Sequence, residues 1–285
     1  MLTPFYIPPE QAIEIGFSFY SDRKIAKLGN SFFSSLIGRR EQFEIIVFGV
    51  SHVGKTTLGL FIEGNRTFED IRKAERSIGF EGYSFMENYN GALIITPGEK
   101  RHEEENIKKL KEIIAKKKPF GFINVVSYGY QFAKELEYED IIPSGKTLEN
   151  YLEERRQQEI DSIKKLTTLI SKAENLTWML TLVTKQDLWW DKRDEVENYY
   201  KVGEYSKITK EIEEEHEKIF GVRNNTFVHK CISSSFVISN VYSKDFKPIA
   251  YVIPGYDQYI QIAHWKLIID TLESLISKHK SLSYS

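Results

Sequence analysis

The residues with the clearest chemical meaning follow a short apolar run that begins at position 43. Residues 43–48 read FEIIVF, which is typical of a buried strand, and residues 49–56 read GVSHVGKT, which fits the pattern G-x-x-x-x-G-K-[ST]. Gly49 and Gly54 allow the backbone to turn tightly, so that successive N–H groups point inward and can cradle phosphate oxygens. The helix that follows adds partial positive charge at its start. The stretch therefore predicts a phosphate-binding loop.

Two side chains of this loop complete the predicted chemistry. Lys55 supplies the positive charge that reaches the β- and γ-phosphates of a nucleotide, and the Thr56 hydroxyl is placed to ligate Mg²⁺. The alternative is a glycine-rich turn that precedes a lysine by chance, and the strand–loop–helix context speaks against it. The nucleotide-binding candidates in the stretch are Gly49, Ser51, His52, Val53, Gly54, Lys55, Thr56 and Thr57.

Strand-like runs alternate with amphipathic helical patterns along most of the chain. The runs cover residues 43–48, 92–96, 120–127, 178–183 and 226–232, with partial alternation over 77–86 and a possible pair of short strands within 236–254. Helical patterns cover residues 57–62, 101–118, 151–173, 206–220 and 258–277. This order predicts an α/β fold, in which a mostly parallel sheet of about six strands carries helices on both faces. In such sheets the ligand lies beyond the carboxyl ends of the strands.

Two parts of the chain lie outside this alternation. Residues 1–42 form an N-terminal extension that we expect to pack on the main domain, residues 43–280. Prolines at positions 4, 8 and 9 favour an extended start, and residues 22–36 have a helical pattern. A helix that binds a membrane surface or a partner is the alternative for this extension. Residues 128–150 lack a clear period and read as an irregular insertion, so the two parts are the expected partner surfaces.

The composition narrows the class of protein. With 285 residues, 41% of them hydrophobic and 28% charged, the chain can form a core of ordinary size. A formal net charge of −2 gives no electrostatic support for nucleic-acid binding. A single cysteine, Cys231, favours a reducing compartment. No apolar run is long enough to span a membrane and the start does not resemble a signal peptide, so we expect a cytoplasmic protein.

A second motif follows the predicted strand 178–183. Thr184-Lys185-Gln186-Asp187 resembles the [NT]-K-x-D motif with which the Ras-like P-loop GTPases, members of the TRAFAC class, read guanine. In that resemblance the Asp187 carboxylate accepts two hydrogen bonds, from the ring N–H and the exocyclic amine of guanine, a donor pair that adenine lacks. Lys185 lies over the base, and Thr184 ties this loop to the phosphate-binding loop. A solvated turn is the alternative.

The resemblance covers residues 43–277 and implies a Ras-like G domain. It assigns Thr67 to switch I, as a Mg²⁺ ligand beside Thr56, although a solvent-facing loop threonine is equally consistent. Thr96-Pro97-Gly98 is similar to the end of the D-x-x-G motif of switch II, where the Gly98 amide binds the γ-phosphate. The resemblance thus implies a catalytic set of Lys55, Thr67, Gly98 and Glu99.

The chain departs from the family pattern at several positions. Ile95 stands where the switch II aspartate is expected, a loss shared by some bacterial Ras-like GTPases. Glu99 stands where many members carry a glutamine that positions water; it acts as a base only if its pKa is raised. Ser51 and His52 replace loop glycines, with Ser51 near the γ-phosphate and His52 facing solvent. Ser233-Ser234-Ser235 resembles the S-A-K loop, which places Ser233 and Ser234 among the base-binding candidates.

The function implied by the resemblance is that of a molecular switch. It binds GTP or GDP with Mg²⁺, hydrolyses GTP slowly because two switch positions are irregular, and acts on a protein effector or needs an activating partner. A scaffold that holds GTP or GDP without hydrolysis is the first alternative, and a P-loop ATPase is the second. The sequence identifies neither the effector nor the oligomeric state.

Overall fold

The computed structural model describes most of the chain. It covers residues 3–21, 43–63, 79–84, 91–98, 103–131, 142, 145–221, 227–236, 241–242, 248–250 and 255–283. The helix expected over residues 22–36, the switch I candidate Thr67, the switch II candidate Glu99 and residues 132–141 of the expected insertion lie outside these ranges.

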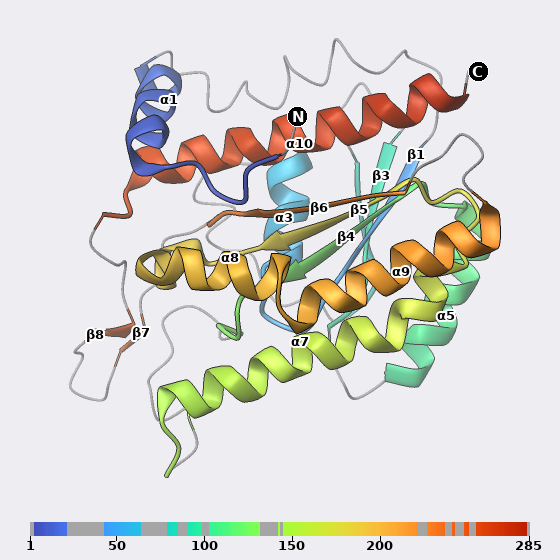
Figure 1. Cartoon of the computed structure of the whole chain (residues 1–285), viewed down its shortest axis with the longest axis horizontal. Helices are drawn as coiled ribbons and strands as arrows, with labels where there is room; N and C mark the ends of the chain where they lie inside the picture. The colour runs from blue at the N-terminus through green and yellow to red at the C-terminus, as the bar shows by residue number, and fades with distance from the viewer. Residues whose placement is uncertain are drawn as a thin grey trace.

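A six-stranded sheet forms the centre of the fold (Figure 1). Its strands are β1 (Phe43–Phe48), β2 (Glu81–Ser84), β3 (Gly91–Ile95), β4 (Gly121–Val126), β5 (Trp178–Val183) and β6 (Val228–Ser233). They lie in the order β2-β3-β1-β4-β5-β6, and every neighbouring pair is parallel except β2 with β3. The predicted α/β fold with a mostly parallel sheet is confirmed. A separate antiparallel pair, β7 (Val241–Tyr242) and β8 (Pro248–Ala250), lies within the predicted region 236–254.

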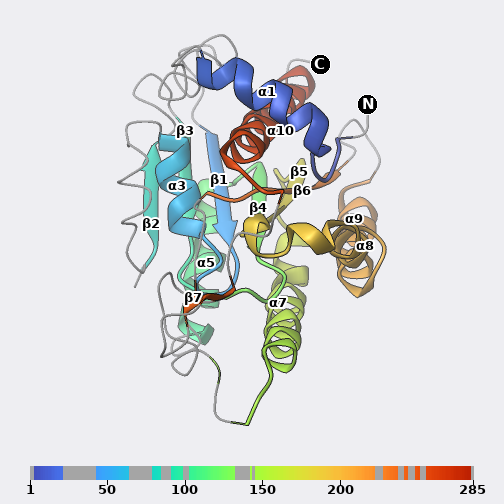
Figure 2. The ribbon, with the colours of Figure 1, turned by 90° about the vertical axis from the view of Figure 1, so that its left-hand side faces the viewer.

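Helices cover both faces of the sheet, as Figure 2 shows with the sheet seen near its edge. On one face are α1 (Pro9–Ser21), α3 (Lys55–Glu63) and α10 (Gln258–Ser283). On the other are α5 (Glu103–Lys117), α7 (Leu148–Ser171), α8 (Arg193–Lys201) and α9 (Glu204–Phe220). Two short 3₁₀ turns, η2 (Gln186–Leu188) and η3 (Trp190–Lys192), lead from β5 toward α8. None of the helices that the structure describes is long and apolar enough to cross a membrane.

The two-sided burial explains why the central strands β1, β4 and β5 are mostly apolar. In β1, Ile45 and Val47 belong to the core under α3 and α10, whereas Ile46 and Phe48 belong to the core under α5 and α7. Neighbouring residues of a strand point to opposite faces, so a strand covered on both sides has no position for an exposed polar side chain. The short apolar runs of the sequence therefore predicted the strands well.

The structure corrects the prediction for the start of the chain. The prolines were expected to keep it extended, but α1 begins at Pro9, since the first helical position needs no backbone N–H and proline already has the required φ. Before α1, Phe5 and Ile7 are buried. The Phe5 carbonyl accepts hydrogen bonds from both the backbone N–H and the hydroxyl of Ser233, at 2.8 and 2.9 Å. The Ile7 N–H donates to Nε2 of His264 on α10, at 3.0 Å.

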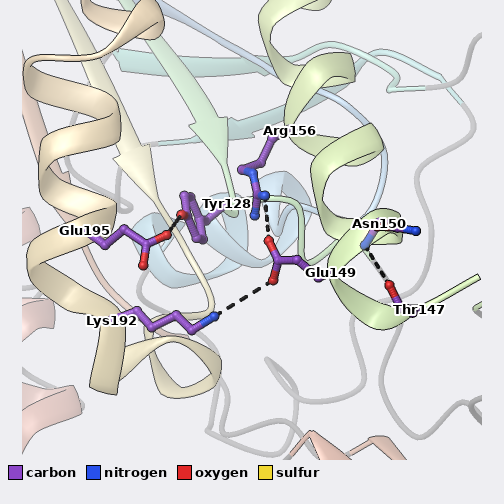
Figure 3. Close-up of polar contacts among 7 residues, drawn as sticks. All are labelled: Tyr128, Thr147, Glu149, Asn150, Arg156, Lys192 and Glu195. Carbon is purple, nitrogen blue, oxygen red and sulfur yellow. Dashed lines mark hydrogen bonds and ion pairs between the residues drawn. The ribbon is translucent and has the colours of Figure 1, made fainter.

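Both ends of the expected insertion 128–150 are held by helices on one side of the sheet (Figure 3). At the first end, the Tyr128 hydroxyl donates to the Glu195 carboxylate on α8. At the other end, Glu149 accepts a hydrogen bond from Arg156 of α7 at 2.8 Å, and Lys192 lies 3.9 Å from the same carboxylate. The Arg156 guanidinium also stacks 4.7 Å above the Tyr128 ring. These contacts fix where the segment leaves and rejoins the domain.

Helix α7 begins three residues earlier than the pattern predicted. The Thr147 hydroxyl accepts a hydrogen bond from the Asn150 N–H at 3.2 Å, which is the usual N-terminal cap of a helix (Figure 3). Helix α8 was not predicted at all. Its sequence, RDEVENYYK, is mostly polar and aromatic, and only Val196 and Tyr200 are buried.

Candidate functional site

The predicted motifs meet at one edge of the sheet. The carboxyl ends of β1, β3, β5 and β6 lead directly into the phosphate-binding loop, the Thr96–Gly98 turn, the Thr184–Asp187 turn and the serine triplet. Strand β2 runs antiparallel to β3, so β2 begins at this edge: its first residue, Glu81, pairs with Ile95, the last residue of β3. Parallel strands thus bring together segments that are far apart in the sequence, as expected for a ligand site of an α/β sheet.

The phosphate-binding loop has the backbone geometry that its glycines permit. Gly49 has a φ of 141°, and a Cβ atom added there would lie 2.2 Å from the Val125 carbonyl oxygen, so no other residue fits. Gly54 has a φ of 95° at the point where the loop enters α3. His52 is exposed, as predicted, and adopts the left-handed conformation with a φ of 62°.

Lys55 lies folded into the loop rather than extended into solvent. Its Nζ donates hydrogen bonds to the backbone oxygens of Gly49 at 2.8 Å and Val50 at 2.7 Å. Burial lowers the pKa of Lys55 to about 7, while the nearby Glu81 carboxylate acts in the opposite direction. A buried ammonium is stabilised by an adjacent anion. The charge of Lys55 is therefore best satisfied when an anionic group lies against the loop.

The turn after β3 touches this loop directly. The Ser51 hydroxyl donates to the Gly98 carbonyl oxygen at 2.7 Å. A Cβ atom added at Gly98 would lie 2.6 Å from both the Lys55 Nζ and the Ser51 backbone nitrogen. Only glycine fits such a close approach, so the turn at Gly98 lies directly against the phosphate-binding loop. Its contact with a γ-phosphate remains a prediction.

The fold and the sequence imply Mg²⁺, and the donors present here fit this ion. Ile95, at the position of the expected aspartate, is fully buried in the apolar core and offers no oxygen. The Thr56 hydroxyl, however, lies 3.4 Å from the Glu81 carboxylate. In the described part of the chain, no three His, Cys, Asp or Glu side chains gather to hold a metal by themselves. One hydroxyl and one carboxylate suit Mg²⁺, which usually takes its other ligands from substrate phosphates and water.

The Thr184–Asp187 turn is tied to the phosphate-binding loop by a hydrogen bond. The Thr184 hydroxyl, which is buried, donates to the Val53 carbonyl oxygen at 2.6 Å and to the Val126 carbonyl oxygen at 3.0 Å. The Thr184 N–H donates to the same Val126 oxygen at 2.7 Å. This is the connection between the two loops that the family resemblance implies. Lys185 follows in the left-handed conformation, with a φ of 56°.

Asp187, the carboxylate that the resemblance assigns to base recognition, is fully enclosed by the protein. Its exposed fraction is 0%, and the Ser235 hydroxyl donates a hydrogen bond to its Oδ1 atom. Tyr256, just before α10, packs against the Trp190 ring, and its hydroxyl donates to Gln186 at 3.4 Å. Burial and then the Asp187 charge raise the pKa of Tyr256, which keeps its hydroxyl protonated.

The serine triplet is only partly arranged as predicted. Ser233 was expected to contact the base, but its N–H and its hydroxyl both donate to the Phe5 carbonyl oxygen, which gives it a structural role. The Ser234 hydroxyl is buried and has no hydrogen-bond partner among the described residues. Ser235 was not among the predicted site residues, although it is the serine that contacts Asp187. The sequence signal was the triplet itself, which does not show where β6 ends.

The strand order and the loop geometry define an α/β domain of the P-loop type. No protein-family model matches the chain, and no curated protein matches it either. Among solved structures, the mammalian SRP receptor matches with a TM-score of 0.38 and 14% identity, over 83% of this chain and 99% of that chain. Toc33 from Arabidopsis thaliana in complex with Mg²⁺ and GMPPNP matches with a TM-score of 0.38 and 11% identity, over 93% of this chain and 94% of that chain.

Proposed function

We propose that this protein binds guanine nucleotides with Mg²⁺ at the carboxyl edge of its sheet, hydrolyses GTP slowly and acts as a nucleotide-dependent switch. The observation that carries the proposal is the hydrogen bond from Thr184 to Val53, at 2.6 Å. It couples the loop that suits phosphates to the turn that carries Asp187. Two motifs that are about 130 residues apart in the sequence thereby become one site.

The phosphate part of the site works by charge and fixed geometry. The loop amides, the start of α3 and Lys55 bind the β- and γ-phosphates. Lys55 exchanges its hydrogen bonds to the carbonyls of Gly49 and Val50 for bonds to phosphate oxygens. The negative phosphates stabilise the protonated lysine, whose charge burial disfavours. Bound Mg²⁺ neutralises part of the charge on the phosphates. Thr56 provides one ligand, and Thr67 remains the candidate for a second.

The base part of the site selects guanine through Asp187. Its carboxylate accepts from the two neighbouring donors of guanine, and Ser235 holds the carboxylate in place. Because Asp187 has no exposed surface, the base enters only when the segment that carries Tyr256 moves aside. Nucleotide exchange is therefore coupled to the region before α10.

Slow hydrolysis follows from what surrounds the γ-phosphate position. Phosphoryl transfer to water needs a positioned nucleophile and neutralised charge. Ile95 supplies neither, because it is an apolar core residue. The same burial of Ile95 favours a second candidate function, a scaffold that holds GTP or GDP without hydrolysing it. In either case the nucleotide-sensitive turn at Gly98 is the expected contact for a protein effector.

Binding experiments with the full chain test the proposal. Purified protein freed of nucleotide is titrated with GTP, GDP and ATP in Mg²⁺, and we expect a clear preference for the guanine nucleotides. Lys55→Ala should abolish binding. Asp187→Asn should shift the preference toward xanthine nucleotides, because the asparagine oxygen can accept from the xanthine ring N–H while its amide N–H donates to the neighbouring carbonyl of xanthine. Equal affinity for GTP and ATP would refute the guanine assignment. A single-turnover assay separates the switch from the scaffold, since the scaffold releases no phosphate above the rate without protein.

A further inference from the structure

Because Ile95 replaces the switch II aspartate, another residue would have to supply the carboxylate beside Thr56. Ile95 lies at the end of β3, and its side chain is in the core with Leu58 and Val47. The next strand outward is β2, whose antiparallel register places Glu81 directly opposite Ile95. The structure thus has a carboxylate on β2, at the position that pairs with Ile95, and none at the end of β3.

The contacts of Glu81 direct it toward the phosphate-binding loop. Its Oε2 atom accepts hydrogen bonds from the Tyr83 hydroxyl at 2.8 Å and the Thr56 hydroxyl at 3.4 Å. Its charge also acts on the Lys55 ammonium. Residues 81 and 83 lie on the same side of the strand, so Tyr83 can hold the carboxylate in this direction. Glu81 therefore has a fixed orientation beside the hydroxyl that the P-loop offers to a metal ion.

We propose that Glu81 takes the place of the absent switch II aspartate and supplies the carboxylate of the magnesium site, directly or through a metal-bound water. This assignment rests on the proposed nucleotide function, because the phosphates provide the other ligands. Tyr83 is a positioning residue in this assignment, since it contacts Glu81 and orients its carboxylate toward Thr56. In this assignment the chain keeps its metal site although residue 95 is an isoleucine, because the carboxylate comes from β2 instead of β3.

The Glu81 charge should change nucleotide affinity in opposite directions with and without Mg²⁺. With Mg²⁺ bound, the Glu81 charge attracts the ion and strengthens nucleotide binding. Without Mg²⁺, the same charge repels the nucleotide phosphates, so its removal should leave affinity unchanged or raise it. A glutamate that only supports the fold would produce neither pattern, because its loss would weaken binding equally in both conditions.

The experiment measures the affinity for GDP with Mg²⁺ and with EDTA, in wild type, Glu81→Gln and Tyr83→Phe. We expect Glu81→Gln to bind GDP in EDTA at least as tightly as wild type and to require about tenfold more Mg²⁺ for half-maximal enhancement. Tyr83→Phe should shift the Mg²⁺ requirement in the same direction by less. Glu112→Gln, an exposed carboxylate on α5, is the matched control and should behave as wild type. Mn²⁺ bound to the GDP complex, counted by electron paramagnetic resonance, gives a second readout and should decrease in Glu81→Gln.

The outcomes separate this assignment from the function on which it rests. If wild type binds GDP and Glu81→Gln keeps the full Mg²⁺ enhancement and the full Mn²⁺ signal, Glu81 is not part of the metal site. An equal loss in Mg²⁺ and EDTA would also overturn the assignment, since it indicates a role in the fold alone. If wild type binds GDP in neither buffer, the proposed function fails, and the assignment fails with it.

Discussion

The substitution Thr184→Val tests whether the two loops form one site. Valine keeps the size and branching of threonine but removes the hydroxyl that donates to the Val53 oxygen at 2.6 Å and the Val126 oxygen at 3.0 Å. The Val126 oxygen keeps the Thr184 N–H as a donor, so the loss falls mainly on the buried Val53 carbonyl. Leaving such a group without its partner costs about 1–3 kcal/mol.

The expected result has two parts, and urea unfolding and GDP titration measure them separately. At an m-value of about 3 kcal/mol per M, the unfolding midpoint in urea should fall by roughly 0.3–1 M. Affinity for GDP should fall about tenfold, which corresponds to about 1.4 kcal/mol, because the phosphate-binding loop loses its support at Val53. A nucleotide titration by fluorescence or calorimetry measures this second effect.

Thr177 provides a matched control at the other end of β5. Its hydroxyl donates to the Phe120 carbonyl oxygen at 3.1 Å, and its N–H donates to the same oxygen at 2.9 Å. Thr177→Val should lower stability by less than Thr184→Val, because the Phe120 oxygen keeps the N–H of residue 177 as a donor. It should leave GDP affinity unchanged, because this edge of the sheet carries no predicted site. The reasoning would be refuted if Thr184→Val lost stability but bound GDP as tightly as the control.

Three further predictions address other parts of the structure. Burial lowers the pKa of His264 to about 4, so the folded protein favours the neutral imidazole. About 3 kcal/mol of stability, present above pH 6.5, should therefore be lost as the pH falls toward 4. Urea titrations at several pH values measure this dependence of stability on pH, and His264→Gln should flatten it. Tyr256→Ala should uncover Asp187 and speed GDP association in stopped-flow measurements, whereas an unchanged rate would show that Tyr256 does not limit access. Gly98→Ala should weaken GDP binding at least tenfold because of its clash with Lys55, and unaltered affinity in a titration would contradict that close approach.

The sequence predicted the parts of the fold that depend on local signals. Strand β5 was expected over residues 178–183 and is found there, because a short and mostly apolar run between polar turns is typical of a strand buried on both faces. Helix α1 was missed because prolines near its start suggested an extended chain. Helix α8 was missed because its pattern is largely polar and it is separated from α9 by only two residues.

The site could be predicted only where one motif carried the signal by itself. The phosphate-binding loop is contiguous, so the sequence could predict its tight turns, and Gly49 and Gly54 have the positive φ values that such turns need. The role proposed for Glu81 depends on the antiparallel register between β2 and β3, which a sequence does not reveal. The serine that contacts Asp187 is the third of the triplet, and choosing it requires knowing that β6 ends at Ser233. Tyr256, whose pKa the Asp187 charge raises, lies 69 positions further along the chain, so the sequence does not show that the two residues are close.

The hydrogen bonds from Ser233 to the Phe5 oxygen connect the N-terminal segment of the chain to the end of β6, close to Asp187. The oxygen of Phe5 holds the final residue of β6, and Ser235 stands two positions later. A partner that displaced residues 3–8 would remove these hydrogen bonds, and in the proposed function this would weaken binding of the base. If the proposed function holds, the N-terminal segment could therefore regulate base binding without contacting the phosphates.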